Sequence, residues 1–120
     1  MELEDIAKKM CLTGKGILAA DESTGTIAKR FKSINVENLE TNRLIFRQTL
    51  FNSSAMKEYI GGVILFDETI RQKTTMGLTI PELISKNGAM PGIKVDKGAK
   101  SLAGSAEETV TEGLDGLRER

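Results

Sequence analysis

Ionisable side chains gather at the ends of three short apolar runs in this 120-residue sequence. Each run ends in a charged pair: Asp21 with Glu22, Asp67 with Glu68, and Lys94 with Asp96. If the runs are neighbouring parallel strands of a βα barrel, these pairs face an active site at one end of the barrel. A lysine in an apolar strand is costly to bury unless a carboxylate pairs with it. A structural ion pair, or an acid that caps a helix, is the competing interpretation.

The segment 21–30 is the densest polar stretch after any of these runs. It carries three hydroxyls and two cations: Ser23, Thr24, Thr26, Lys29 and Arg30. The hydroxyls precede an expected helix start, where free backbone N–H groups attract anions. The segment therefore predicts a phosphate-binding site. Ordinary N-capping by Ser23 or Thr24, with a solvated Lys–Arg pair, explains the same residues equally well.

Composition limits the partners and cofactors. The chain contains 17 Lys and Arg residues and 17 Asp and Glu residues, so its formal net charge is zero. Such a chain has no bulk attraction to nucleic acid or to an anionic membrane. There is no histidine and only one cysteine, so zinc or iron chemistry is not expected, and we predict no metal and no cofactor.

Compartment signals favour the cytoplasm. The first five residues are acidic rather than basic and apolar, unlike a secretory signal, and no apolar run approaches the roughly 20 residues that span a bilayer. The single cysteine, Cys11, has no internal partner for a disulfide.

Three strands follow from the apolar runs, at residues 16–22, 62–68 and 92–97. Each run is continuous rather than alternating, which is typical of strands covered on both faces of a parallel sheet. The dinucleotide-like pattern at 14–19 precedes its strand instead of following it, so it does not indicate a nucleotide site.

Helical periodicity occupies the gaps between the strands. Helices are predicted at 3–11, 23–33, 38–51 and from Pro81 to Gly88, with another beginning near Gly113. In the third of these, we expect Leu39, Phe46 and Leu50 on one side, with Arg43 elsewhere. Alternating strands and helices predict an α/β fold with right-handed crossovers.

Three parallel strands leave two unpaired edges, and an eight-stranded (β/α)₈ barrel needs roughly 250 residues. We therefore expect residues 1–120 to form an incomplete TIM-barrel domain, with an N-terminal helix and about the first three βα units. A flavodoxin-like or Rossmann sheet is the alternative.

Several segments, in order and over nearly the whole chain, resemble the motifs of class I (Schiff-base) fructose-bisphosphate aldolases. They are Gly14–Gly25, Ile60–Thr69, Pro91–Gly98, Leu102–Gly104 and Gly113–Leu117. The resemblance implies an N-terminal fragment of an enzyme of glycolysis that reversibly cleaves fructose 1,6-bisphosphate to dihydroxyacetone phosphate and glyceraldehyde 3-phosphate. In this family a lysine forms an imine with the substrate ketone, which makes cleavage possible without a metal.

The resemblance also implies roles for individual residues. Asp21 matches the catalytic aspartate of the first strand, which helps to move protons. Phosphate contacts are implied for Ser23, Thr26 and Lys94, and a bisphosphate contact for Arg30. Arg43 matches an arginine sometimes tied to substrate binding, although a surface charge would explain it too.

The resemblance also leads us to expect a particular subunit assembly and to expect that the isolated chain is inactive. Asp115 lies in a segment that resembles a subunit contact of these homotetrameric enzymes. The family's imine lysine, fourth-strand lysine and fifth-strand glutamate have no counterpart in these residues, so we expect the isolated chain to be inactive. Two alternatives remain: a non-catalytic sugar-phosphate-binding or assembly protein, and a transaldolase-like enzyme, which the match at 21–25 disfavours.

Overall fold

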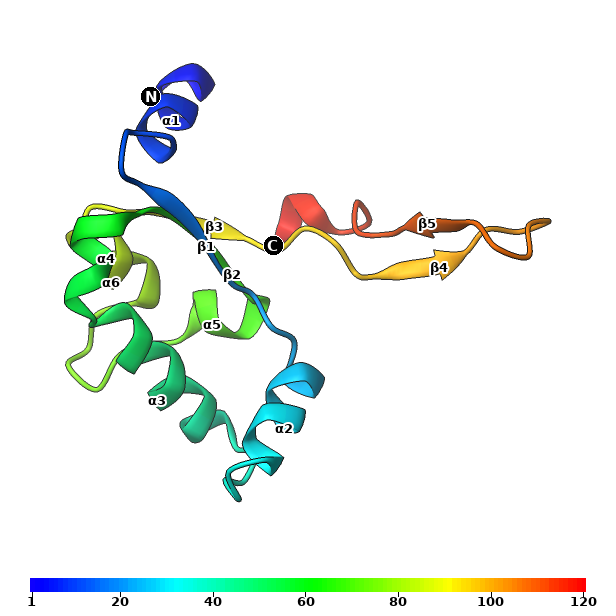
Figure 1. Cartoon of the computed structure of the whole chain (residues 1–120), viewed down its shortest axis with the longest axis horizontal. Helices are drawn as coiled ribbons and strands as arrows, with labels where there is room; N and C mark the ends of the chain where they lie inside the picture. Colours follow the sequence, from blue (N-terminus) through cyan, green and yellow to red (C-terminus); the bar gives the residue numbers. More distant parts are fainter.

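A parallel sheet of three strands forms the centre of the fold, which we describe from a computed structural model of residues 1–120. The strands are β1 (Gly16–Ala20), β2 (Ile60–Leu65) and β3 (Met90–Ile93), in the order β1-β2-β3 (Figure 1). Ala20 pairs with Leu65, and Leu65 pairs with Ile93. The carboxyl ends of all three strands are therefore level with one another.

The sheet confirms the predicted parallel α/β arrangement but shortens each strand. The predicted strands ran on to residues 22, 68 and 97, whereas the observed ones end at Ala20, Leu65 and Ile93. The charged residues at these ends thus lie just beyond the sheet, because Asp67 already begins a helix and Ser23 already caps one. A flavodoxin-like sheet would place its first strand between the second and third, which the observed order excludes.

Four predicted helices are confirmed with small shifts of their ends: α1 (Leu3–Met10), α2 (Thr24–Lys32), α3 (Glu40–Phe51) and α6 (Ile80–Lys86). Two helices were missed, α4 (Ser54–Tyr59) and α5 (Asp67–Arg71). They are six and five residues long, which is too short to display a 3.6-residue period.

Helix α6 shows why its ends could be predicted. The Thr79 side chain accepts a hydrogen bond from the backbone N–H of Glu82, whose carboxylate accepts one from the N–H of Thr79. Pro81 lies in the first turn, where its missing N–H costs nothing. Gly88 follows Asn87 at the other end with a φ of +84°, a conformation that glycine adopts without strain.

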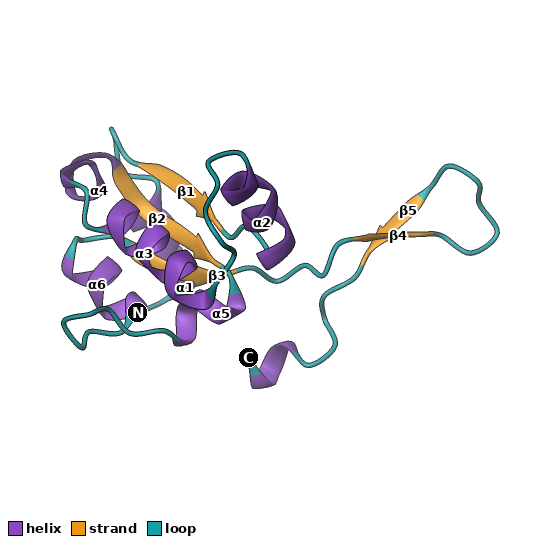
Figure 2. Ribbon diagram, turned by 90° about the horizontal axis from the view of Figure 1, so that it is seen from below, coloured by secondary structure: helices purple, strands orange, loops and turns teal.

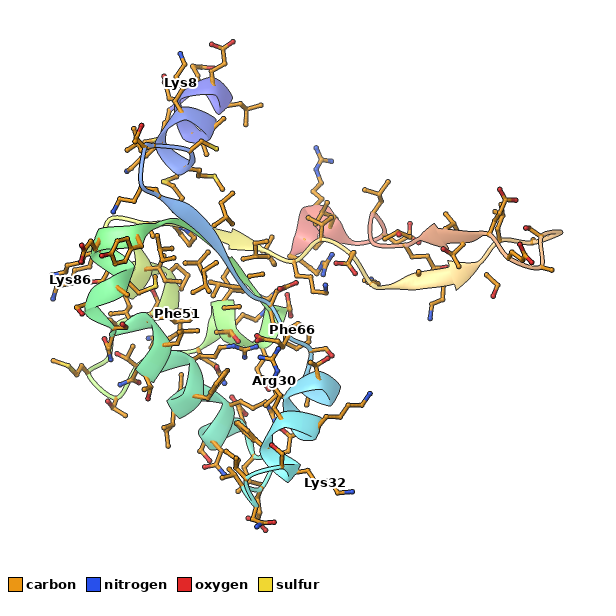
Figure 3. All side chains as sticks on the ribbon, viewed as in Figure 1. Lys8, Arg30, Lys32, Phe51, Phe66 and Lys86 are labelled. Carbon is orange, nitrogen blue, oxygen red and sulfur yellow. The ribbon has the colours of Figure 1, made fainter.

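The hydrophobic core lies between the sheet and helices α3, α4 and α6. Its buried members are Ala20, Phe51, Met56, Val63, Leu65, Ile80, Leu83, Ile84 and Ala89. Figure 3 shows Phe51 inside this layer, whereas Lys32 and Lys86 point outward. None of the helices is long and apolar enough to cross a membrane.

Helix α3 corrects a prediction about its buried face. Its fully or nearly buried residues are Arg43, Arg47 and Phe51, spaced four apart along one stripe, whereas Leu39 is about half exposed. Two arginines therefore face inward where apolar residues were expected. Their carboxylate partners, described below, explain how the helix can bury them.

The chain beyond β3 differs most from the prediction. Strands β4 (Ala99–Ser101) and β5 (Thr109–Thr111) pair antiparallel in a hairpin that projects from the body as an arm (Figures 1 and 2). The predicted helix near Gly113 is wrong, since only a 3₁₀ turn forms, at Leu117–Glu119. Gly113 and Gly116 have φ values of +153° and +70°, which no right-handed helix contains.

A close approach between α1 and β2 requires glycine at one position. A Cβ added to Gly61 would lie 2.5 Å from the backbone oxygen of Met10. At Gly62 the nearest atom is the terminal methyl of the flexible Met10 side chain, which can move aside. The end of α1 is therefore held against the start of β2 by backbone contact at a single residue.

We predict that Gly61→Ala lowers the free energy of unfolding by about 1–3 kcal/mol, because backbone must shift to admit the methyl group. Gly62→Ala should cost less. Gly25→Ala is the control, since no atom lies within 4 Å of its Cβ position in α2. There the change should be neutral or stabilising by about 0.5–1 kcal/mol. Urea titration of the three variants checks this ranking, and a Gly61→Ala variant as stable as Gly25→Ala would contradict it.

Candidate active site

Lys94 is the centre of a charged cluster at the level carboxyl ends of the strands. Its Nζ lies 2.6 Å from Oδ2 of Asp96 and 3.1 Å from Oδ2 of Asp21. The backbone N–H of Lys94 donates to the carbonyl of Leu65 at 2.8 Å, which continues the sheet register one residue past β3. The sheet therefore brings together Asp21 and Lys94, which are 73 residues apart in the sequence.

A pocket of about 670 Å³ opens beside this cluster. Its polar lining consists of Ser23, Asp67, Lys94, Asp96, Lys97 and Arg120. Two of the predicted site residues, Ser23 and Lys94, therefore share one cavity, with Asp21 in direct contact with Lys94. The lining mixes cations and acids around a hydroxyl, as expected for a site that binds a polar, charged molecule.

The two carboxylates hold Lys94 in its charged form. Hydrogen bonds to Asp96 and then to Asp21 raise the pKa of Lys94 above its ordinary value, although partial burial opposes them. The same bond from Lys94 lowers the pKa of Asp96. An ammonium group has three N–H donors, of which two are used here. Lys94 can therefore offer one donor to an anion, but it is poorly suited to act as a free amine nucleophile.

Ser23 and Thr26 form the N-terminal cap of α2. The Ser23 hydroxyl oxygen accepts from the backbone N–H of Thr26 at 3.4 Å and lies 3.2 Å from the Thr26 hydroxyl. This is the capping arrangement named as the alternative to a phosphate site. Ser23 also lines the pocket, whereas Thr26 is exposed outside its lining.

Arg30 lies on the same helix, and its guanidinium binds the carboxylate of Glu22. Its side chain is 56% exposed and does not line the pocket. The contact between Arg30 and a substrate phosphate stays a prediction. In this structure the guanidinium of Arg30 is paired with the carboxylate of Glu22 instead.

Arg43 is buried in a structural ion pair. Its Nε and Nη2 donate to the two carboxylate oxygens of Glu68 at 2.8 and 2.7 Å, and Nη1 donates to the carbonyl and side-chain oxygens of Asn38. The hydrogen bond from Arg43 lowers the pKa of Glu68 despite its burial, and the same bond raises the pKa of Arg43. The pocket lining does not include Arg43, whose predicted role in substrate binding stays untested.

The sequence analysis did not identify three residues that lie near the site: Arg47, Lys97 and Arg120. Lys97 and Arg120 line the pocket because the backbone after β3 folds back toward it. Arg47 contacts Glu22, one residue from Asp21. The only signal for Arg47 was its position four residues after Arg43, which places both arginines on one helix face.

Comparison with known proteins gives one consistent result. The family model described as "Glycolytic: Fructose-bisphosphate aldolase class-I" matches residues 2–120. The chain is 55% identical over 119 residues to a probable fructose-bisphosphate aldolase class 1 of Xylella fastidiosa (strain Temecula1), covering 99% of this chain and 36% of that protein. It is 58% identical over 120 residues to fructose-bisphosphate aldolase A of Salmo salar, covering 99% of this chain and 33% of that protein. Aldolase 5 of Arabidopsis thaliana, which is named as cytosolic, is also 58% identical.

A solved structure shares the fold. The match is the fructose-bisphosphate aldolase of Plasmodium falciparum in complex with TRAP and a small-molecule inhibitor, with a TM-score of 0.89 and 47% identity. It covers 96% of this chain and 33% of that one. The chain thus spans about a third of the length of the proteins that it matches.

We predict an acid-dependent loss of stability from the Glu68–Arg43 pair. Because the folded-state pKa of Glu68 is below its ordinary 4.5, the pair stabilises the fold above pH 4.5. That contribution is lost as the pH falls through the lowered pKa. Glu68→Gln should lower the free energy of unfolding by about 1–3 kcal/mol at pH 7, since it weakens the partner of a buried guanidinium.

The difference between Glu68→Gln and the unaltered chain should begin to shrink as the pH falls below 4.5. It should be smallest below the lowered folded-state pKa of Glu68, where both chains carry a neutral side chain at this position. Denaturant titrations at pH 7, 4 and 3 measure it. Glu108→Gln, on the exposed arm, is the control and should follow the unaltered chain throughout. A constant difference at all three pH values would refute the assignment.

Proposed function

This chain belongs to the class I fructose-bisphosphate aldolase family, and from that premise we propose that it forms part of the sugar-phosphate site of such an enzyme. The reaction is the reversible aldol cleavage of fructose 1,6-bisphosphate to dihydroxyacetone phosphate and glyceraldehyde 3-phosphate. The proposed location is the cytoplasm, in line with the cytosolic relative. In the completed protein the three parallel strands would be neighbours in a (β/α)₈ barrel.

One observation carries this proposal: Lys94 lies in a pocket at the strand ends, with its charge fixed by Asp21 and Asp96. Active sites of βα barrels lie at this end of the strands. A fixed ammonium beside an open cavity is suited to bind a phosphate group. A carboxylate in contact with the same ammonium would lie beside a sugar phosphate bound there.

Each site residue then has a proposed role. Asp21 moves a proton during cleavage of the carbon–carbon bond. Ser23, Thr26 and Lys94 hold one phosphate at the start of α2, where the helix dipole also favours an anion. Arg30 would contact the bisphosphate only after leaving Glu22, and Arg43 would support the site through Glu68 rather than touch the substrate.

The chain by itself lacks the electron sink that the reaction needs. The family's imine comes from a lysine that has no counterpart here, and Lys94 is held as an ammonium ion without a free electron pair. We therefore propose that these 120 residues bind sugar phosphate but do not cleave it. A homotetramer is the proposed assembly of the whole protein, with Asp115, which is exposed, in the segment that resembles a subunit contact.

A non-catalytic sugar-phosphate-binding protein is the second candidate. It would use the same charged pocket at the strand ends for binding alone. The two candidates differ in whether the pocket supports cleavage when the remaining length of an aldolase accompanies it.

We predict that the isolated chain shows no cleavage of fructose 1,6-bisphosphate and incorporates no substrate on treatment with borohydride, because no imine forms. A coupled assay for the triose phosphates, with mass spectrometry of the borohydride-treated chain, measures both. A covalent adduct at Lys94 would contradict the assignment of this residue as a fixed cation.

We further predict that a chimera is active, in which this chain replaces the matched third of aldolase A from Salmo salar. Asp21→Asn in the chimera should lower kcat by about 10²–10⁴-fold, the usual contribution of a positioned acid–base group. Lys94→Met should mainly raise KM, because it removes a phosphate contact. Glu108→Gln is the matched control and should change neither. A folded chimera without cleavage would favour the non-catalytic candidate.

A further inference from the structure

Arg47 is a fully buried arginine close to the candidate site but outside its lining. Its side chain is the largest that the protein buries completely, with 0% of the residue exposed. Removing a guanidinium from water costs several kcal/mol, and a well-packed apolar side chain at such a position is often equally stable or more so. The stripe on α3 that continues to Phe51 could accept one. Stability alone is therefore a weak explanation for Arg47.

The contacts of Arg47 are concentrated on one residue of the strand end. Its Nη2 donates to the backbone carbonyl of Glu22 at 2.9 Å and to Oε2 of the same residue at 3.0 Å. Its Nη1 donates to the hydroxyl of Thr69 at 3.3 Å, and Nε has no partner. The guanidinium also lies 5.7 Å from the ring centre of Phe46. Arg47 thus connects α3 to α5 and to the residue that follows Asp21.

Glu22 is held at three points as a result. Arg47 holds its carbonyl and one carboxylate oxygen, and Arg30 holds the other carboxylate oxygen. Although burial favours the neutral acid, hydrogen bonds to the Glu22 backbone and to Arg47, with the charges of Arg47 and Arg30, lower the pKa of Glu22. The carboxylate is therefore ionised and remains a strong acceptor at neutral pH.

Side chains alternate along an extended chain, so the contacts that hold Glu22 also determine which way the neighbouring Asp21 side chain points. Ala20 faces the buried core, and Glu22, two residues later, is on the same side facing Arg47. Asp21 lies between them and points to the opposite side, where it meets Lys94. Beyond Ala20 no strand pairing fixes the backbone. In this segment the backbone carbonyl and the carboxylate of Glu22 are held by Arg47, and the carboxylate also by Arg30.

We propose that Arg47 is a positioning residue, which holds the carbonyl and carboxylate of Glu22 and thereby aims Asp21 at Lys94. The importance of that aim for catalysis rests on the proposed function, but the aim itself is a property of this chain. The charged groups around Lys94 are Asp21, Asp96, and the pocket-lining Asp67, Lys97 and Arg120. Of these groups, only Asp21 is adjacent in sequence to Glu22, the residue that Arg47 holds.

The test measures the pKa of Lys94 in the 120-residue chain with ¹³C-labelled lysine side chains, titrated by NMR. Lys94→Met identifies the signal. Asp21→Asn sets the full effect of losing the Asp21 contact. We expect Arg47→Met to lower the Lys94 pKa by at least half of the fall that Asp21→Asn produces, and Arg47→Lys to lower it less, because one ammonium cannot span both oxygens of Glu22 as the guanidinium does.

Arg43→Met is the matched control. Arg43 lies one turn away on the same buried stripe of α3 and also pairs with a glutamate, but it makes no contact with Glu22. It should destabilise the chain, as measured by urea titration, without lowering the pKa of Lys94. A merely structural role for Arg47 predicts the same behaviour for both arginines.

Three results would overturn the proposal. They are an ordinary Lys94 pKa in the unaltered chain, an unchanged Lys94 pKa in Arg47→Met, and an equal fall in Arg43→Met. If Arg47→Met does not fold, Arg47→Lys and the double variant Arg47→Met with Glu22→Gln, which also removes the charge that Arg47 had paired, decide the question. No sugar phosphate enters this measurement, so its failure is distinct from failure of the chimera to cleave substrate.

Discussion

The level register of three parallel strands is the constraint on which the rest of the site depends. Because Ala20, Leu65 and Ile93 lie side by side, the next residues of β1 and β3 emerge at the same height and on the same edge. Asp21 and Lys94 are thereby brought to 3.1 Å without a connecting element of their own. A shift of one residue in either strand would turn one of these side chains to the other face of the sheet. The apolar pairing of β2 with both neighbours therefore fixes the polar chemistry at its end.

The sequence predicted those parts of the fold that have a strong local cause. The three apolar runs, the start of α6 at Pro81 and four of the five predicted helices are each encoded within a few residues, and the structure contains them. The charged ends of the strands could be predicted for the same reason. The pairing of Lys94 with Asp96 was visible in their spacing, although these residues lie beyond the strand rather than within it.

The remainder depended on contacts between distant segments. The buried face of α3 carries Arg43 and Arg47 because Glu68 and Glu22 lie opposite them, and no pattern within the helix reveals those partners. The hairpin arm forms by pairing β4 with β5 across a loop, and the backbone conformations of Gly113 and Gly116 are incompatible with the helix predicted there. Motif resemblance pointed to the charged residues at the strand ends but not to the buried arginine behind them.

Charge balance implies that the proposed phosphate site needs more than Lys94. Asp21, Asp96 and Lys94 together carry a formal charge of −1, so an approaching anion meets net repulsion from this trio alone. Lys97, Arg120 and the start of α2 supply positive charge around the same pocket. An anion can bind the third N–H donor of Lys94, which neither carboxylate uses, so both carboxylate contacts can remain in place. The Asp96 side chain is 42% exposed and that of Asp21 is 22% exposed, so Asp21 is the better shielded partner, and the proposed hold on Glu22 would maintain its contact with Lys94.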